Sequence, residues 1–231
     1  MNDTPVLAEA NGLAARLRTA TDAAHRAAES TPYITALIAG QIPRAGYTAL
    51  VAQHYFLYET LEQAAEAMRD DPVAGPFVAD ELTRLPWLAE DLAFLLGPQW
   101  REQIAPGTAT DAYRDRLREV CFTWPAGFIA HHYTRYLGDL SGGAFVAAAV
   151  RRTYDFTTDD GTRFYQFDGI PSRGRFKREY RDRLDALALD AAEAERTAAE
   201  AVIAFELNRA MFQQLGAAHP ASPAVGTVNP I

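Results

Sequence analysis

Apolar residues recur at helical spacing along almost the whole chain, and this pattern restricts the possible fold more than any other feature. The periodic segments are residues 12–29, 31–39, 44–69, 77–95, 110–121, 125–154, 173–189 and 191–215. Alanine, leucine, glutamate and arginine dominate the composition, whereas β-branched residues are too sparse to supply a large sheet. We therefore predict an all-α fold, a bundle of about eight helices.

The domain organisation follows from the length and from where the periodicity stops. With 231 residues, 48 % of them apolar, one large domain is expected, and we place it at residues 11–215. Residues 1–10 and 216–231 carry no periodic apolar pattern, so we predict a flexible N-terminus and a flexible C-terminal tail. Residues 155–172 alternate aromatic and polar side chains around Gly161 and are predicted to form a short extended excursion rather than a sheet.

Charge and cysteine content exclude several classes of protein. The formal net charge of -8 argues against a nucleic-acid partner, because such proteins need a basic surface to displace counterions. The single cysteine, Cys121, excludes an internal disulfide and a cysteine-rich zinc site. No signal pattern opens the chain, and no run of about 18 apolar residues exists to span a membrane. We expect a soluble, cytoplasmic protein without a membrane partner.

Three glycines, Gly138, Gly142 and Gly143, interrupt an otherwise helical pattern. Glycine inside a helix costs about 1 kcal/mol relative to alanine, so this concentration requires a reason. Gly138 and Gly142 are one turn apart and share a face, where a flat group can rest on the backbone and the helix can bend. Close packing of helices is the more frequent reason for such glycines, so they do not decide the question alone.

Arg135 and Asp139 stand four residues apart beside the same glycines. An ion pair at this spacing is common on helix surfaces and contributes little to stability. A carboxylate next to an open, apolar-lined site can also order water there. The pair is therefore compatible with a surface role and with a functional one.

The string YTRYLGDLSGG, which begins at Tyr133 and includes these residues, resembles the distal-helix signature of the haem oxygenases. The resemblance implies a haem held between a proximal first helix and a glycine-kinked distal helix. It implies that the backbone of Gly138, Gly142 and Gly143 lies over one face of the haem. It assigns the carboxylate that holds a network of distal waters to Asp139, with Arg135 in support.

A bound haem needs an axial ligand, and His25 is the best placed of the five histidines. Arg18 lies two turns before it and Glu29 one turn after it on the predicted first helix, so the three share a stripe. This stripe offers a cation for a propionate, an imidazole for iron and a carboxylate for the other ring N–H. His131 and His132 are expected to serve helix packing or to face solvent. The family resemblance places the proximal histidine at His25.

The richest basic cluster, SRGRFKREYRDR, contains Lys177 and Arg181 one turn apart. A basic stripe is usually solvated surface, but in an acidic protein it can also bind an anion. The cluster resembles the propionate-binding helix of the haem oxygenases. That resemblance assigns the propionates to Lys177 and Arg181, together with Arg18 and Tyr133.

Two further stretches, LVAQHYFLYETLE and AFELN, resemble the same family. By position, Tyr58 and Asn208 correspond to polar members of the distal water network, and Phe205 to an aromatic of the haem wall. Without the resemblance an aromatic at helical spacing is core, and an asparagine is a satisfied helix polar group. Ala144 departs from the family pattern, in which many relatives have glutamine.

The implied activity is the oxidative cleavage of haem by O2 to biliverdin, at the α meso position, with release of CO and ferrous iron. Haem is then both cofactor and substrate. The sequence carries no GxGxxG or other flavin or nicotinamide motif, so electrons are expected from an external reductase or ferredoxin.

Three alternatives stay open at the level of sequence. A haem carrier or sensor would share His25 and the propionate cluster but has no need of Asp139 beside a glycine helix. A thiaminase-type helical fold needs a nucleophilic cysteine, and Cys121 has no convincing neighbours. A di-iron bundle needs paired Glu-x-x-His motifs, which the chain lacks.

Overall fold

The computed structural model describes residues 12–222, and every regular element within this range is helical. The helices are α1 Leu13–Glu29, α2 Pro32–Ile38, α3 Arg44–Met68, α4 Leu85–Leu96, α5 Thr108–Val120, α6 Pro125–His132, α7 Gly138–Tyr154, α8 Arg173–Asp185 and α9 Ala191–Ala218. Single 3₁₀ turns occur at Gly75–Phe77, Asp80–Leu82, Trp100–Glu102 and Arg163–Tyr165, and a π-helical turn, Tyr133–Leu137, joins α6 to α7. The all-α prediction is confirmed.

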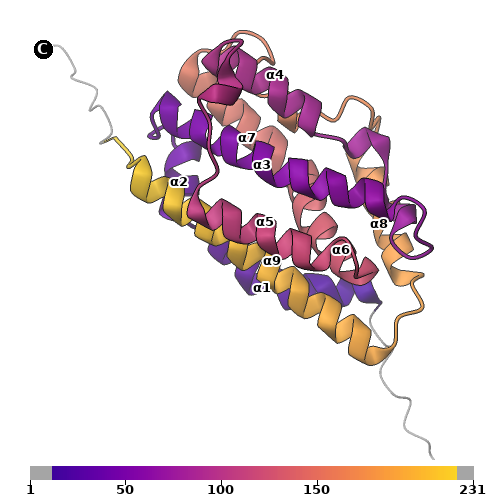
Figure 1. Ribbon diagram of the computed structural model, residues 1–231. Helices are drawn as coiled ribbons and strands as arrows, with labels where there is room; N and C mark the ends of the chain where they lie inside the picture. Colours follow the sequence, from indigo (N-terminus) through magenta and orange to yellow (C-terminus); the bar gives the residue numbers. More distant parts are fainter. Residues whose placement is uncertain (1–11, 223–231) are drawn as a thin grey trace, which may run out of the picture.

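The long helix α3 lies at the centre of the bundle, with α4 on one side of it and α5 and α9 on the other (Figure 1). α1 and α9 lie side by side along one edge, and α5 and α6 also pack on α9. Large side chains of α3, including Tyr47, Leu50, Leu57 and Tyr58, are at most 2 % exposed. This central position brings Tyr58, in the middle of α3, against the segment that carries the predicted distal residues.

Local sequence signals explain several helix ends. Pro32 occupies the first turn of α2, where its missing N–H costs nothing, and Pro43 directly precedes α3. Gly40 follows α2 with a φ of 72°, a left-handed conformation that favours glycine. Ser172 and Asp190 cap α8 and α9 by accepting hydrogen bonds from backbone N–H groups three residues further on.

The predicted helix over 77–95 is wrong at its start. α4 begins at Leu85, and the preceding residues form separate 3₁₀ turns. Pro86 supplies the reason, because proline is tolerated in the first turn of a helix but breaks a helix interior. α8 also ends earlier than predicted, at Asp185.

At the other end of the chain, α9 continues to Ala218, into the segment predicted as a tail over 216–231. The predicted flexible N-terminus, 1–10, and residues 223–231 of that tail lie outside the described residues. Between residues 12 and 222, no helix is long and apolar enough to cross a membrane.

The segment predicted as one helix over 125–154 is continuous but irregular. α6, the π turn and α7 follow one another without a break, and the π turn ends immediately before Gly138. A π turn inserts one extra residue into the helical ladder and is frequent at functional sites. The sequence predicted a bend at the glycines, whereas the departure from α geometry lies in the turn before them.

The connection over 155–172 contains no strand and folds as turns around one 3₁₀ turn. Asp155 ends α7 in the left-handed region, with a φ of 55°. The buried carboxylate of Asp91 accepts hydrogen bonds from the backbone N–H groups of Arg163 and Phe164, each at 2.9 Å. These contacts fix the connection on α4 and set Tyr165 against α7, where it meets Gly143.

Candidate functional site

One cleft collects many of the predicted site residues. Its volume is about 970 Å³, and its walls come from α1, the π turn, α7, α8 and α9. From the predicted set it is lined by Arg18, His25, Tyr133, Gly138, Arg181 and Phe205. Tertiary packing therefore brings the predicted proximal and distal sides to one place, from helices more than a hundred residues apart in sequence.

His25 lies on the face of α1 that borders the cleft, with 43 % of its side chain exposed. Phe205 of α9 packs against the imidazole edge to face, with ring centroids 5.3 Å apart. Ala24 and Ala28 of α1 complete this small apolar cluster. The histidine is thus supported from α9 while part of its ring stays accessible.

Glu29 contacts the same imidazole, as predicted, through its carboxylate at 3.2 Å from Nε2. It does not line the cleft, and its side chain is 64 % exposed. A ring nitrogen that keeps this contact cannot bind iron at the same time. Iron ligation through Nε2 therefore requires the ring to turn over, or the Glu29 carboxylate to move to the other nitrogen, whereas ligation through Nδ1 would leave the contact in place.

The three glycines serve two different purposes. A Cβ added at Gly138 or at Gly142 would meet no atom within 4 Å, so both present bare backbone to open space, and Gly138 lines the cleft. A Cβ at Gly143 would lie 2.9 Å from Cδ1 of Tyr165. Gly143, predicted to contact haem, is instead buried against Tyr165 and permits close packing of the 155–172 connection.

A polar network stands behind the exposed glycines. The Tyr58 hydroxyl of α3 donates a hydrogen bond to the Asp139 carboxylate. Arg135 lies in the π turn, 6 % exposed; its Nη2 is 4.0 Å from the other Asp139 oxygen, and its Nη1 donates to Asn208 Oδ1 of α9 at 2.8 Å. All four residues predicted for the distal network are therefore connected.

The charges within this network are set by burial. Burial raises the pKa of Asp139, although the Arg135 guanidinium and the hydrogen bond from Tyr58 oppose the rise. Burial also raises the pKa of Tyr58 well above its usual value. Burial opposes the charge on Arg135, but Tyr58 and Asp139 outweigh it and raise its pKa. The network therefore holds a permanent cation beside a carboxyl group whose affinity for protons is increased.

The basic side of the cleft differs in part from the prediction. Arg18 of α1 and Arg181 of α8 both line it. Burial raises the pKa of the Tyr133 hydroxyl, and the guanidinium groups of Arg181 and Arg18 only partly oppose the rise. Lys177 is not a lining residue; its Nζ donates to Ser141 Oγ of α7 at 3.0 Å and so ties α8 to the glycine helix. Arg178, which the sequence analysis did not single out, lines the cleft.

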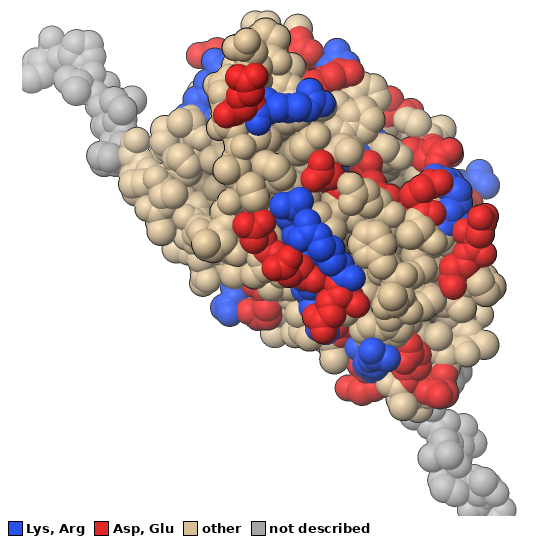
Figure 2. Space-filling model, in the orientation of Figure 1, with Lys and Arg blue, Asp and Glu red and all other residues tan. Residues whose placement is uncertain are grey.

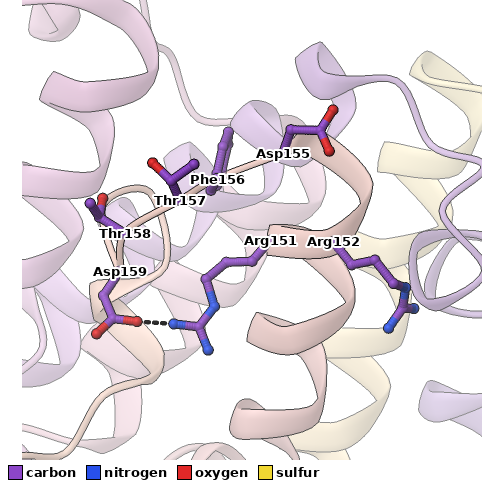
Figure 3. A pocket seen from close by; sticks show the side chains of 7 residues that line it. All are labelled: Arg151, Arg152, Asp155, Phe156, Thr157, Thr158 and Asp159. Carbon is purple, nitrogen blue, oxygen red and sulfur yellow. Dashed lines mark hydrogen bonds and ion pairs between the residues drawn. The ribbon is translucent and has the colours of Figure 1, made fainter.

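A second hollow lies at the end of α7, and Figure 3 shows its lining. Its volume is about 520 Å³. Arg151 forms an ion pair with Asp159, whereas Arg152 points to the opposite side. None of the predicted site residues lines this hollow, which is formed by the end of α7 and the start of the 155–172 connection at the surface.

Acidic and basic side chains are interspersed on the face that carries α3, α4 and α5 (Figure 2). On α5, Arg114 pairs with Glu59 of α3, and Arg118 pairs with Asp115 one turn away. The second of these pairs is exposed, and exposed pairs contribute little to stability. This face offers mixed charge rather than a field of one sign.

A family model described as heme oxygenase matches residues 11–214, most of this chain. The chain belongs to the haem oxygenase family. It is 38 % identical over 205 residues to heme oxygenase 1 of Nostoc sp., an alignment that covers 89 % of this chain and 86 % of the relative. The resemblance drawn from YTRYLGDLSGG is thereby confirmed.

Two solved haem oxygenases from Synechocystis sp. share the fold. The crystal structure of heme oxygenase-1 in complex with heme gives a TM-score of 0.86 at 36 % identity, covering 90 % of this chain and 93 % of that one. The structure of heme oxygenase-2 with heme and NO gives 0.86 at 38 % identity, covering 90 % and 86 %. The family match and the shared fold rule out the thiaminase-type and di-iron alternatives. Cys121, which the thiaminase-type alternative would need as a nucleophile, is buried, and burial raises the pKa of its thiol.

Proposed function

We propose that this haem oxygenase binds haem in the cleft, with His25 as axial ligand to the iron, and opens the ring to biliverdin, CO and ferrous iron. One observation carries the proposal: an accessible imidazole on α1 and the bare backbone of Gly138 border the same cleft. A flat, largely apolar ligand fits between such walls, and the cleft volume lies within the range of small-molecule sites.

Bound haem would supply the iron, the site of O2 binding and the ring carbon that is oxidised. His25 would hold the iron from the proximal side, and Phe205 would keep its ring upright. Glu29 would accept the N–H of the ring nitrogen that does not face the iron, which fixes the tautomer and increases the basicity of the ligand.

On the distal side, Asp139 would act through water rather than by direct contact. Its carboxyl group is anchored by Tyr58 and faces Arg135, so its position is fixed from two directions. Its raised pKa favours holding a proton that can pass to an ordered water. Asn208 keeps Arg135 oriented. The glycines leave room for O2 and exclude side chains from the reacting face.

The basic rim would bind the two propionates and so set the in-plane rotation of haem. Arg18, Arg181 and Tyr133 face the cleft together, and Lys177 stands at its edge on Ser141. A fixed rotation selects one meso carbon, and we assign the α carbon. Arg178 extends the cationic side.

Electrons would come from an external reductase or ferredoxin that docks near the exposed basic side chains of α8. The absence of bound flavin or nicotinamide stays a prediction from the sequence, as does a cytoplasmic location.

The test is to add haemin to the purified protein and to His25→Ala, then a reductase system under air with catalase. Growth of a biliverdin absorption band with loss of the Soret band supports the proposal. His25→Ala should lose the absorption spectrum of imidazole-ligated haem and should lose ring opening, and added imidazole should restore part of both. A stable ferrous-oxygen spectrum in the wild type would favour the carrier or sensor alternative.

A further inference from the structure

His54 of α3 is a buried histidine that the site described above does not use. It is 5 % exposed, and neither Nδ1 nor Nε2 has a hydrogen-bond partner among the described residues. A buried imidazole in either tautomer has one N–H donor and one acceptor, and leaving both unpaired is costly. Such groups in folded proteins are usually hydrogen-bonded to internal water.

The neighbours of His54 place it next to the distal network. It lies one turn before Tyr58 on α3, with ring centroids 6.5 Å apart, and its other side packs on Phe164 at 5.2 Å. Arg135 lies over the Tyr58 ring, with Cζ 5.2 Å from the centroid. The Tyr58 ring is therefore in contact with both the imidazole and the guanidinium.

Arg135 has the complementary requirement. Its Nε and Nη2 atoms are buried and have no hydrogen-bond partner among the described residues. The hydroxyl groups of Thr110 and Tyr113 on α5 are also buried and without a hydrogen-bond partner among the described residues. A guanidinium donates but cannot accept, and the Asp139 oxygen that faces Nη2 is 4.0 Å away, beyond direct hydrogen-bond distance, so an internal water can supply the acceptor that Arg135 lacks.

We infer that His54 is a positioning residue: it holds an internal water against Arg135 and thereby fixes the hydrogen-bond network around Asp139. This inference rests on the proposed function. Burial, followed by the nearby Arg135 charge, lowers the pKa of His54, so the imidazole stays neutral and keeps an acceptor nitrogen. The water accepts from Arg135 and donates to that nitrogen.

The first test uses the haem-free wild-type protein labelled with ¹⁵N-histidine. NMR should detect His54 as neutral in one tautomer from pH 6 to 8, with a ring N–H protected from exchange and a nuclear Overhauser contact to a long-lived water. A His54 ring that averages both tautomers, or that shows no bound water, overturns the inference without reference to activity.

The second test compares His54→Leu and His54→Gln after haem loading. Leucine removes both hydrogen-bonding groups, and we expect a roughly tenfold lower yield of biliverdin per electron consumed, with the difference released as hydrogen peroxide and with haem affinity unchanged. Glutamine keeps a donor and an acceptor and should restore most of the coupling. If His54→Leu does not fold, the role of His54 is decided by the NMR result and by the yield of biliverdin per electron in His54→Gln.

His132→Gln is the matched control. His132 is equally buried, but its Nδ1 is already paired with the Tyr180 hydroxyl at 2.9 Å. His132→Gln should leave the yield of biliverdin per electron unchanged. An equal loss of this yield in His132→Gln and His54→Leu would mean that His54 serves packing alone. Failure of the wild type to open haem would refute the proposed function, and the haem-free NMR measurement would still decide the role of His54.

Discussion

The two kinds of glycine in the distal helix lead to opposite predictions for alanine substitutions. At Gly138 and Gly142 an added Cβ meets nothing within 4 Å, and Gly138 has an ordinary helical φ of -60°. Each alanine should then stabilise the haem-free protein by about 1 kcal/mol through helix propensity. For a domain of this size that corresponds to a rise in Tm of about 2–4 °C.

Gly143→Ala should act in the other direction. Its Cβ would lie 2.9 Å from a ring carbon of Tyr165, which is 4 % exposed and has no free space to retreat. Overpacking of this kind costs about 1–3 kcal/mol, which exceeds or cancels the gain in propensity. The Tm of this variant should therefore fall or stay unchanged.

Function should separate from stability in the same set of variants. A methyl group at Gly138 projects into the cleft proposed for haem, so haem affinity and biliverdin yield should fall in Gly138→Ala while the Tm of the haem-free protein rises. Thermal unfolding by circular dichroism, haem titration in the Soret band and product chromatography measure the three quantities. The reasoning is refuted if Gly138→Ala lowers the Tm of the haem-free protein, or if the Gly138→Ala/Gly142→Ala double variant opens haem at the wild-type rate.

Three further predictions follow from the site and its supports. Asp139→Ala should keep haem affinity but lose biliverdin formation by about 10²-fold in single-turnover spectra, and retained ring opening would contradict its proposed role. Arg181→Gln should change the ratio of biliverdin isomers more than Lys177→Gln, which chromatography of the products can check, because Lys177 is held on Ser141. Glu200, 3 % exposed, pairs with an arginine and a histidine that hold the pKa of its carboxyl group down to about 2. A carboxyl pKa that is lower in the folded than in the unfolded protein stabilises the fold at pH values above the unfolded pKa, and this stabilisation is lost as the pH falls towards 2. Glu200→Gln should therefore lower the free energy of unfolding, measured in urea, by about 2–3 kcal/mol at pH 7 and by much less at pH 3. An equal loss at both pH values would contradict this pH dependence.

The helical fold was predictable because its signals are local. Periodicity of apolar residues and single residues such as Pro32 and Pro43 act within one or two turns, and the observed helices follow them closely. The start of α4 was predicted wrongly because periodicity was given more weight than Pro86, whose effect on the backbone is local as well. The sequence analysis did not predict the π turn, which carries Arg135 into contact with Tyr58 of α3 and Asn208 of α9.

The candidate site was predictable only where a residue type and a family string agreed. His25, Gly138 and Asp139 were predicted from that agreement; His25 and Gly138 line one cleft, and Asp139 belongs to the adjoining network. Gly143 could not be distinguished from its neighbour, because only the packing of Tyr165 reveals that this glycine serves a close contact. His54 gave no signal, since an isolated histidine on a helix is ordinary until its burial is known.

The sequence by itself determined the helices, their order and the chemistry available on each, because these depend on spacing along the chain. Tertiary structure alone decided which groups are deprived of water. Contacts between segments distant in sequence raise the pKa of Asp139 and bury nitrogens of Arg135 and His54 without hydrogen-bond partners. They also leave Gly142 facing open space while Gly143 packs against Tyr165. Burial and electrostatics depend on distance in space rather than in sequence, and this is why only the fold could set them.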